Sequence, residues 1–385
     1  MKIAFLTEKY TPDIGGLAIS AERFARLMTS TGHEVRVFAP TLHLPTSETR
    51  TLAANGVTVT RFGAHKRVDD TLVDWFELLV AEHQSEPFDV IHAYFLSQAG
   101  FVAAYAGRYL GLQSVVSARG NDIERAIFDP SRAAHILYAL QHASAVTTNA
   151  SELAKKAQAL IPGLEVTIIP NGIDPDHFKP LPRNIGLVES LNLINKGQVE
   201  ASARVIGFAG ELREKKGLRP LLRAYAQLNK KYAATLLIVG DIRAGEDKQI
   251  FDDFQLAHPA ASIRVTGFIS PADLPAYYSL MDVFVHPSLR DGLPNALLEA
   301  MACGIAVVGT PVGGIKDAVF DCENGRLVST SNVNQLASAI DELLTNEDLR
   351  TKLGGAGRQT IIDNFSLESE LDGNLAVYQR LGLET

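Results

Sequence analysis

The sequence predicts an α/β protein built from two open, mostly parallel sheets that follow one another along the chain. Short apolar runs of strand length alternate with helical segments, the order that builds βαβ units and a parallel sheet. This alternation stops near residue 175 and restarts near residue 203, and 385 residues are too many for one ordinary core. We therefore expect two Rossmann-like domains that face each other across a cleft, because sheets of this kind bind ligands at the carboxyl ends of their strands.

The first domain is expected over residues 1–180 and opens with the apolar run 2–7. A loop with two glycines follows, and SAERFARLMTSTGH then predicts a helix, with Ser20 as its N-cap and Gly32 as its stop. Later strands are expected at EVRVFAP, GVTVTRF, FDVIHAYF, QSVVSA, ASAVTTN and VTIIPNG. Helical segments such as TLVDWFELLVAEH and GFVAAYAGRYLGL separate many of them.

The segment from Pro175 to Ala203 has three prolines and little periodicity, which predicts an interdomain linker. The second domain is expected over residues 200–365. Its predicted strands are ARVIGFAG, ATLLIVGD, SIRVTGF, VFVHPS, IAVVGT and GRLV. A C-terminal helix over about 366–385 is expected to pack back on the first domain.

Composition excludes several classes of protein. The net charge of −8 argues against nucleic-acid binding, which needs a basic face. Two cysteines, Cys303 and Cys322, give neither a disulfide framework nor metal-ligand spacing. The N-terminal apolar run is too short for a signal peptide, and no apolar run reaches about 18 residues. We expect a cytoplasmic protein, and the sequence is compatible with peripheral contact at the inner face of a membrane.

Residues 286–304, HPSLRDGLPNALLEAMACG, are the most specific stretch. A strand ends in a loop, and Pro294 suits the first position of the helix that follows, so the loop amides make an anion site at a helix N-terminus. Asp291 either caps this helix or faces a pocket. Glu299 lies between Leu298 and Ala300 in an apolar helix, where an unpaired carboxylate is costly, so it needs a polar partner.

This stretch resembles the signature of retaining glycosyltransferase family 4, which has the GT-B architecture. The family's Glu-x₇-Glu pattern and Ala-Met-Ala-x-Gly run are matched by Asp291, Glu299 and AMACG. The resemblance covers nearly the whole chain, since DIGGLAISAERFARLMTSTGHEV, IIPNGIDPDHFKP and TPVGGIKD are similar to further family motifs in the expected order.

A basic loop in FAGELREKKGL, residues 208–218, is similar to the family's Gly-Arg-Leu-x₃-Lys-Gly motif, whose Arg and Lys hold the donor diphosphate. Lys216 and Gly217 match its end, whereas Glu211 stands at the usual arginine position. Arg213 is the expected replacement from the same loop. Guanidinium and ammonium groups suit a diphosphate that gains charge as the sugar leaves. The competing interpretation is a solvated surface charge cluster.

SARGND, residues 117–122, resembles the family's His-Gly-x-Asp motif, with Arg119 in place of the histidine. Arg119 is interpreted either as a contact to the donor phosphate or as a salt-bridged structural residue. Asp122 either orients an acceptor hydroxyl or caps the next segment. Gly16 is expected to bring its backbone amide near the donor, and VTGFIS resembles the strand end that holds the nucleobase.

The resemblance implies a retaining transfer of a hexose from a nucleotide-sugar, by family frequency UDP-glucose or a similar UDP-hexose, with GDP-sugars second. The acceptor is a hydroxyl of an unknown sugar, lipid or glycan, in polysaccharide or glycoconjugate synthesis. No metal is expected, and Asp174-Pro-Asp176 is attributed to chance because it lies in a junction loop. The implied catalytic residues are Asp291, Arg119 and Asp122. The implied donor contacts are Gly16, Gly210, Glu211, Arg213, Lys216, Gly267, Phe268, Ile269, Asp291, Gly292, Leu293, Pro294, Asn295, Leu298 and Glu299.

Three other functions fit the sequence less well. A dehydrogenase needs G-x-G-x-x-G after the first strand, and EKYTPDIGG does not provide it. A GT-B sugar epimerase would bind the same donor without a second substrate. A non-catalytic sugar-nucleotide-binding protein is disfavoured by the acid pair and the basic loop.

Overall fold

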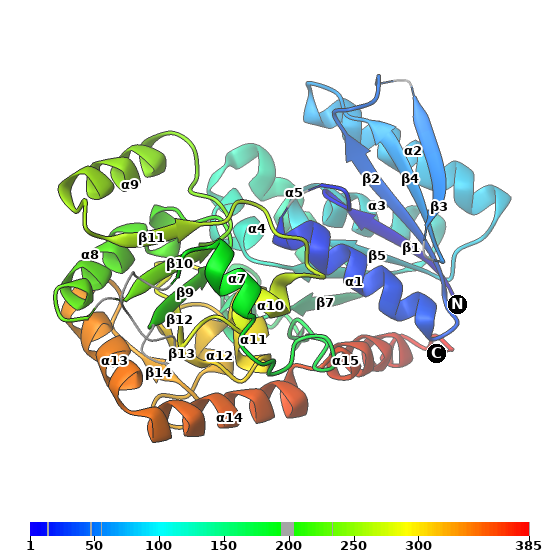
Figure 1. Ribbon diagram of the computed structural model, residues 1–385. Coiled ribbons are helices and arrows are strands. Elements are labelled where there is room, and N and C mark those ends of the chain that lie inside the picture. The colour runs from blue at the N-terminus through cyan, green and yellow to red at the C-terminus, as the bar shows by residue number, and fades with distance from the viewer. Residues whose placement is uncertain (14, 47, 55, 194–203, 233, 385) are drawn as a thin grey trace. The chain divides into compact units, whose positions relative to one another are not determined.

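A computed structural model describes residues 1–13, 15–46, 48–54, 56–193, 204–232 and 234–384. The chain forms two compact units (Figure 1). Unit 1 contains Met1–Asn171 together with Leu367–Thr385, and unit 2 contains Gly172–Ser366. The first segment of unit 1 therefore ends at Asn171, whereas the sequence predicted an end at residue 180. Residues 194–203, which include the predicted start of the second domain, lie outside the described residues.

The described part of the predicted linker is not a linker. It belongs to unit 2, and three of its apolar side chains are buried in the core of that unit, those of Phe178, Val188 and Leu193. Leu181 and Ile185 are exposed. Asn184 caps the short helix α7, Ile185–Ser190, by accepting from the Leu187 amide (3.1 Å). The prolines suggested a linker, but a few buried apolar residues are enough to anchor an irregular segment.

Unit 1 contains an eight-stranded sheet with the order β3-β4-β2-β1-β5-β6-β7-β8, and only β3 is antiparallel to its neighbour. The strands are β1 Lys2–Thr7, β2 Glu34–Thr41, β3 Thr49–Ala54, β4 Val57–Gly63, β5 Val90–Tyr94, β6 Gln113–Ala118, β7 Ala145–Thr148 and β8 Val166–Ile168. Alternate residues of β1 enter different cores, with Ile3 and Phe5 on one face and Ala4 and Leu6 on the other. Strand order reverses at β1 and β5, so the switch point of the sheet lies between them.

Helices cover both faces of this sheet. Their bounds are α1 Gly16–Ser30, α2 Val68–Ser85, α3 Phe101–Leu110, α4 Asn121–Glu124, α5 Pro130–His142, α6 Ser151–Leu160 and α15 Leu367–Arg380, with the π-helix η1 Leu96–Gly100 and the 3₁₀ turn η2 Ala126–Phe128. The predicted start of α1 was wrong. The helix begins at Gly16, after Gly15 at φ 135°, and Ser20 is a buried interior residue.

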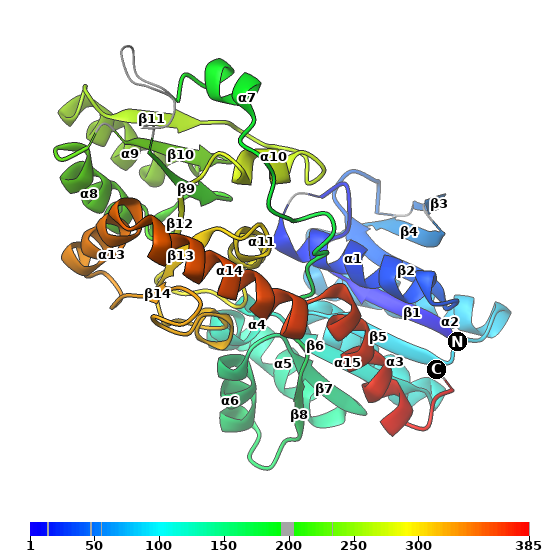
Figure 2. The same ribbon diagram turned by 60° about the horizontal axis from the view of Figure 1, so that its bottom comes forward.

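Helix α15, at the end of the chain, lies beside α1 on one face of the unit 1 sheet (Figure 2). Several polar contacts join it to the rest of the unit. Arg23 Nε donates to Glu370 Oε2 (2.6 Å), and His92 Nδ1 hydrogen-bonds the Tyr378 hydroxyl (2.7 Å). Tyr378 and Val377 are fully or almost fully buried. The last helix is therefore part of the unit 1 core.

Buried His92 predicts that unit 1 loses stability in mild acid. Burial, with the nearby Arg119, lowers the pKa of His92 from 6.5 to about 3. Between these two values the unfolded chain binds a proton that the folded chain does not, so the free energy of unfolding falls as pH falls, by up to about 1.4 kcal/mol per pH unit.

The measurement is urea unfolding followed by tryptophan fluorescence, because Trp75, the only tryptophan, is buried in α2 of unit 1. A His92→Gln variant, whose amide does not titrate, should lose less stability than the unsubstituted chain between about pH 8 and about pH 5. Equal losses in the two proteins would contradict the prediction.

Unit 2 contains a six-stranded parallel sheet with the order β11-β10-β9-β12-β13-β14. The strands are β9 Val205–Ala209, β10 Thr235–Val239, β11 Ser262–Val265, β12 Val283–His286, β13 Ala306–Gly309 and β14 Arg326–Leu327. In chain order within the unit this is 3-2-1-4-5-6, the doubly wound arrangement, and the order reverses between β9 and β12. The loops that follow these two strands are those singled out in the sequence.

The remaining helices surround the unit 2 sheet. Their bounds are α8 Leu218–Asn229, α9 Glu246–Ala257, α10 Leu274–Tyr278, α11 Asn295–Ala302, α12 Ile315–Ala318, α13 Val333–Thr345 and α14 Glu347–Asn364, with the 3₁₀ turn η4 Glu214–Lys216. Helices α8 and α13 pack on one face, and α11 and α12 on the other. No described helix is both long enough and apolar enough to span a bilayer.

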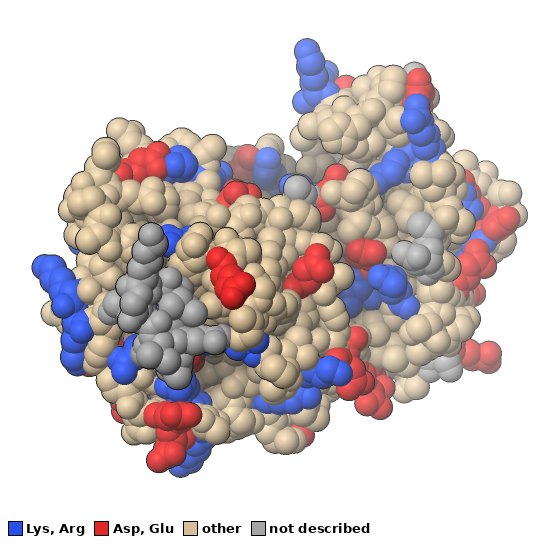
Figure 3. Space-filling model, viewed as in Figure 1, with Lys and Arg blue, Asp and Glu red and all other residues tan. Residues whose placement is uncertain are grey.

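Acidic and basic side chains are interspersed over the surface that Figure 3 shows. This pattern agrees with the net charge of −8 and does not resemble the single-sign basic face of a nucleic-acid-binding protein.

Candidate functional site

Gly217 and a backbone hydrogen bond bring together the loops that follow β9 and β12 in unit 2. Gly217 has φ 83°, and a Cβ there would lie 2.1 Å from the carbonyl oxygen of Pro287. Only glycine allows this approach. The Leu289 amide also donates to the Lys215 carbonyl (2.9 Å). The basic loop and the loop of Asp291 are therefore neighbours at the switch point of the sheet.

The Asp291 carboxylate is the centre of this site. Its Oδ2 pairs with the Lys216 ammonium and accepts hydrogen bonds from His286 Nε2 (3.0 Å) and Ser288 Oγ (3.2 Å), and its Oδ1 accepts from the Gly292 amide (3.1 Å). The Asp291 side chain is only 14% exposed and that of Lys216 only 21%. Burial by itself would raise the pKa of Asp291, but Lys216 and His286 outweigh burial and hold that pKa well below its usual range.

The alternative in which Asp291 caps the following helix is wrong. Helix α11 begins at Asn295, its N-cap is Pro294, and no side chain caps it. Pro294 therefore lies one position before the first helical residue. Asp291 instead links the basic loop to the end of β12, a contact across 75 residues of sequence.

His286 is a site residue that the sequence analysis did not identify. Its ring is almost fully buried beside those of Phe208 and Phe284, with centroids 5.9 and 6.2 Å away. Burial lowers the pKa of His286 despite the hydrogen bond to Asp291, so the imidazole is neutral and donates through Nε2. Its Nδ1 has no hydrogen-bond partner among the described residues. Its position at the end of β12, five residues before Asp291, was the available signal.

Arg213 and Glu211 lie in the same loop and form an ion pair (3.3 Å). Glu211, at the position where the resemblance places an arginine, therefore partly neutralises the expected replacement. The Nε of Arg213 is buried without a partner among the described residues. An N–H that lacks an acceptor in a buried position is costly, and an anionic ligand would satisfy it. Gly210, which precedes Glu211, has φ 112°, and its carbonyl oxygen would lie 2.3 Å from a Cβ on Gly240.

The Gly-Gly turn of TPVGGIKD packs against the backbone of the Asp291 loop. Gly313 has φ 53°, and a Cβ there would lie 1.7 Å from the carbonyl oxygen of Asp291. The amide of Gly314 donates to the carbonyl of Gly292 (2.5 Å). Side chains at these two positions would displace the Asp291 loop, so the turn fixes its backbone.

Glu299 has the polar partner that its apolar helix requires. The buried Tyr278 hydroxyl donates to Glu299 Oε2 (2.7 Å), and burial together with Glu299 raises the pKa of Tyr278 well above 10. The side chain of Leu298 is fully buried in the core, and its amide is bonded to the carbonyl of Pro294 (3.4 Å). Leu298 is therefore not available to a ligand. Leu293 is also buried in the core, at 5% exposure.

The segment expected to hold the nucleobase follows β11. The amide of Gly267, at φ 74°, donates to the carbonyl of Gly240 (3.1 Å), which ties this segment to the end of β10. The ring of Phe268 is 65% exposed, whereas Ile269 packs against the core. Phe268 thus offers an aromatic face for stacking.

In unit 1, the Arg119 guanidinium lies over the Tyr94 ring, 4.1 Å from its centroid, and donates to Asn171 Oδ1 (2.8 Å). No carboxylate pairs with this guanidinium among the described residues. The salt-bridged alternative is therefore unsupported, and the positive charge remains available to an anion.

Asp122 organises a loop rather than facing a ligand. It is 1% exposed, and its carboxylate accepts from the backbone amides of Arg119 (3.1 Å), Gly120 (2.8 Å) and Leu96 (3.3 Å). Burial raises the pKa of Asp122, and these amides oppose the shift. The expected role in orienting an acceptor hydroxyl is not supported, because three backbone donors already use the carboxylate.

The absence of a side chain at Gly16 is not explained by packing. A Cβ at Gly16 would meet no atom within 4 Å, and the same is true of Gly15. Gly15 is required for its positive φ, whereas Gly16 leaves open space at the first turn of α1. This space is compatible with the expected approach of a ligand to the backbone.

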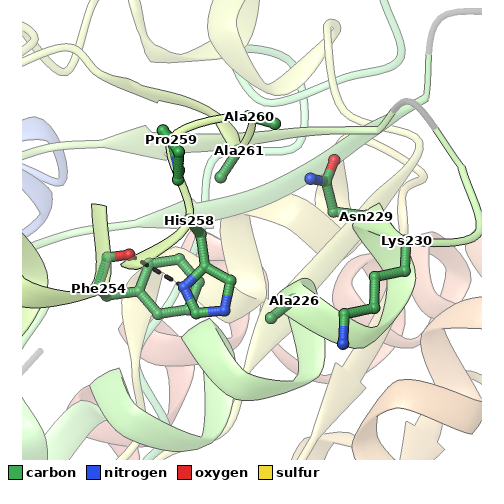
Figure 4. Close-up of a pocket in the computed structure, with 8 residues that line it drawn as sticks. All are labelled: Ala226, Asn229, Lys230, Phe254, His258, Pro259, Ala260 and Ala261. Atoms are coloured by element: carbon green, nitrogen blue, oxygen red, sulfur yellow. Dashed lines mark hydrogen bonds between the residues drawn. The ribbon is translucent and has the colours of Figure 1, made fainter. Parts of the chain in front are cut away.

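A pocket of unit 2 lies away from the site of Asp291. This small pocket is lined by residues at the C-terminal ends of α8 and α9 and in the turn before β11 (Figure 4). This turn precedes its strand, whereas Asp291 follows β12, so the pocket and Asp291 lie at opposite ends of the parallel strands. Of its polar side chains, His258 is hydrogen-bonded through Nδ1 to the Phe254 carbonyl (3.0 Å). Among the described residues no three His, Cys, Asp or Glu side chains are grouped as metal ligands.

Two family models match the chain. The model described as Glycosyltransferase Family 4 matches residues 14–177, and the model described as Glycosyl transferases group 1 matches residues 191–360. Together they span most of the sequence. The second match contains Lys216, Asp291 and Glu299.

Relatives of similar length carry related descriptions. The chain is 28% identical to an uncharacterized glycosyltransferase of Methanocaldococcus jannaschii, over 98% of both chains. It is 27% identical to the GDP-mannose-dependent alpha-(1-6)-phosphatidylinositol monomannoside mannosyltransferase of Mycolicibacterium smegmatis, over 94% of both.

Solved structures share the fold. Sucrose-phosphate synthase from Thermosynechococcus elongatus superposes with a TM-score of 0.81 at 21% identity, covering 99% of this chain and 98% of that one. Anabaena HepE in complex with UDP superposes with a TM-score of 0.80 at 20% identity, covering 99% and 100%. Likeness at these identities concerns architecture alone.

Proposed function

The chain belongs to the group 1 glycosyltransferases, enzymes that transfer a sugar to an acceptor, and has their GT-B fold; from that premise we propose that it is a retaining, metal-independent hexosyltransferase with a nucleotide-sugar donor. The observation that carries the proposal is the joining of Lys216 and Asp291 at the switch point of the unit 2 sheet, with Arg213 in the same loop.

Positive charge is what this arrangement supplies. In the proposed complex, Lys216 and Arg213 contact the diphosphate, whose negative charge grows as the bond to the sugar breaks. Asp291 orients Lys216, and the amides before α11 provide further donors to an anion. Glu299 lies deeper along α11, where we propose that it accepts the ribose hydroxyls. Exposed Phe268 stacks against the base.

Retention is proposed by analogy with the family, and it is proposed without a covalent intermediate on the protein because the carboxylates described at this site are already engaged. Asp291 is engaged by Lys216, His286, Ser288 and the Gly292 amide, and Glu299 by Tyr278. The leaving phosphate can instead accept the proton of the acceptor hydroxyl and guide attack from the face it leaves.

The proposed donor is a UDP-hexose, with GDP-mannose as the second candidate. The second candidate is favoured by the mycolicibacterial relative, which is described as GDP-mannose-dependent. The acceptor is a hydroxyl of a sugar, glycan or glycolipid, and contact with a membrane surface would accompany a lipid acceptor.

The test is incubation of the purified chain with UDP-glucose or GDP-mannose, with and without EDTA, and with monosaccharide and phosphatidylinositol-glycoside acceptors. We expect transfer that survives EDTA, with NMR of the early product showing the anomeric configuration of the donor. Activity lost in EDTA and restored by Mn²⁺, or an inverted product, would contradict the proposal. Epimerised donor without transfer would indicate an epimerase, and donor binding without turnover a non-catalytic binder.

A further inference from the structure

The carboxyl ends of the unit 1 strands include a partly buried carboxylate, that of Glu8, that neither the motifs nor the donor site accounts for. Glu8 directly follows β1, and Ser97 lies in the π-helix η1 that follows β5. These two strands flank the switch point of the unit 1 sheet, the place where open α/β sheets bind ligands. Glu8 therefore stands at the position in unit 1 that Gly210 and Glu211, which follow β9, occupy in unit 2.

The two oxygens of Glu8 differ in their environment. Oε1 accepts from Ser97 Oγ (2.9 Å) and from the Gln98 amide (3.2 Å). No described residue donates a hydrogen bond to Oε2, and this oxygen is not completely buried. The carboxylate is thus held in a fixed orientation by one oxygen, while the other is left to accept from a molecule outside the protein.

The segment that holds Glu8 is itself held in an unusual conformation. Phe95, a non-glycine residue, has φ 74°, and its carbonyl accepts from the Gly100 amide (2.8 Å), where a Cβ would come within 2.8 Å. The amide of Leu96 donates to Asp122. A π-helix and a left-handed bulky residue cost conformational energy, so the surrounding contacts hold this segment in place. In this conformation the segment places the Ser97 hydroxyl against Glu8 Oε1.

We propose that Glu8 binds the acceptor by receiving a hydrogen bond from one of its hydroxyl groups through Oε2, and so contributes to acceptor specificity. This rests on the proposed transferase function. A carboxylate oxygen suits a polyhydroxylic acceptor, whose hydroxyls are donors, and disfavours an anionic group at the same place. Burial raises the pKa of Glu8, and the hydrogen bond from Ser97 opposes this shift. A carboxylate with a raised pKa is a stronger hydrogen-bond acceptor.

The test compares Glu8→Gln with Ser97→Ala in the full-length chain. Glutamine can still accept the two inner hydrogen bonds through its carbonyl oxygen, but presents an amide NH₂ where Oε2 was. Ser97→Ala removes one inner bond and keeps the carboxylate. The assay measures transfer from the best donor to methyl α-mannoside, a neutral sugar hydroxyl probe, together with donor hydrolysis in the absence of the probe.

For Glu8→Gln we expect kcat/KM for the probe to fall on the order of tenfold, through KM, with donor hydrolysis and Trp75 unfolding unchanged. Ser97→Ala should lower the unfolding midpoint while changing KM for the probe less than Glu8→Gln does. A KM unchanged in Glu8→Gln, or a loss explained by its stability alone, would overturn the inference.

Failure of the inference is distinguishable from failure of the proposed function. If the unsubstituted chain hydrolyses the donor but transfers nothing to the probe, the assignment of a sugar hydroxyl to Glu8 is overturned and the donor half of the function stands. If it neither hydrolyses nor transfers, the proposed function falls.

Discussion

Replacement of Lys216 with alanine is expected to lower kcat for sugar transfer by about 100-fold or more. The Lys216 side chain is largely buried beside Asp291, and the charge on the leaving diphosphate is greatest in the transition state. A group that acts mainly in the transition state affects kcat more than the affinity for the nucleotide. The measurement is steady-state transfer, with calorimetry of nucleotide binding to separate the two effects.

The matched control is Lys248, an exposed lysine on α9 of the same unit that pairs with Asp252. Lys248→Ala removes the same charge from unit 2 and should leave transfer unchanged. Normal transfer in Lys216→Ala would mean that the basic loop is only surface charge.

Replacement of Asp291 with alanine is expected to destabilise the protein and to reduce transfer strongly. The variant leaves the ammonium of Lys216 and the imidazole of His286 without their shared acceptor in a largely buried place, and breaking such a pair costs about 3 kcal/mol. Transfer falls because Lys216 loses its fixed orientation. Affinity for the nucleoside diphosphate should stay near normal, because Lys216 also loses a competing anion.

Calorimetric unfolding, nucleotide binding and transfer measured on the same preparation check this prediction. Asp252→Ala is the control, since removal of its exposed pair with Lys248 should cost less than about 1 kcal/mol. The double variant Lys216→Ala with Asp291→Ala should be more stable than the sum of the single losses implies. Normal transfer with only a lowered melting temperature would limit Asp291 to a structural role.

Apolar runs predicted almost every strand, because a parallel strand buried on both faces leaves a continuous apolar segment. Strand β3, TRTLAA, was missed because it has no such apolar segment. It lies at the sheet edge, where Leu52 is 70% exposed, and it is a strand because it pairs with β4. The linker was predicted from prolines and was wrong over its described part, because Phe178 and Leu193 are buried by residues distant in sequence.

The site was predictable where chemistry lies in one continuous motif, as with Lys216, Asp291 and Glu299. The pairing of Lys216 with Asp291 was not, because the contact depends on how two loops meet and neither loop encodes its partner. Leu298 was misassigned since a position within a motif does not reveal which way its side chain points. Glu8 and His286 were missed because a single polar residue at a strand end has no spacing pattern to distinguish it.

The return of α15 to unit 1 has a consequence for the newly synthesised chain. During translation, α1 and the sheet of unit 1 emerge before unit 2, but the face that Tyr378 and Val377 cover stays open until residues 367–385 leave the ribosome, after all of unit 2 has been made. His92 lacks its hydrogen bond to the Tyr378 hydroxyl during the same interval. Unit 2 is continuous in sequence and can complete its core earlier, so the usual N-terminal-first order of domain folding is reversed for the last step. Loss of the last helix would therefore leave the first domain, rather than the second, exposed to proteases and chaperones.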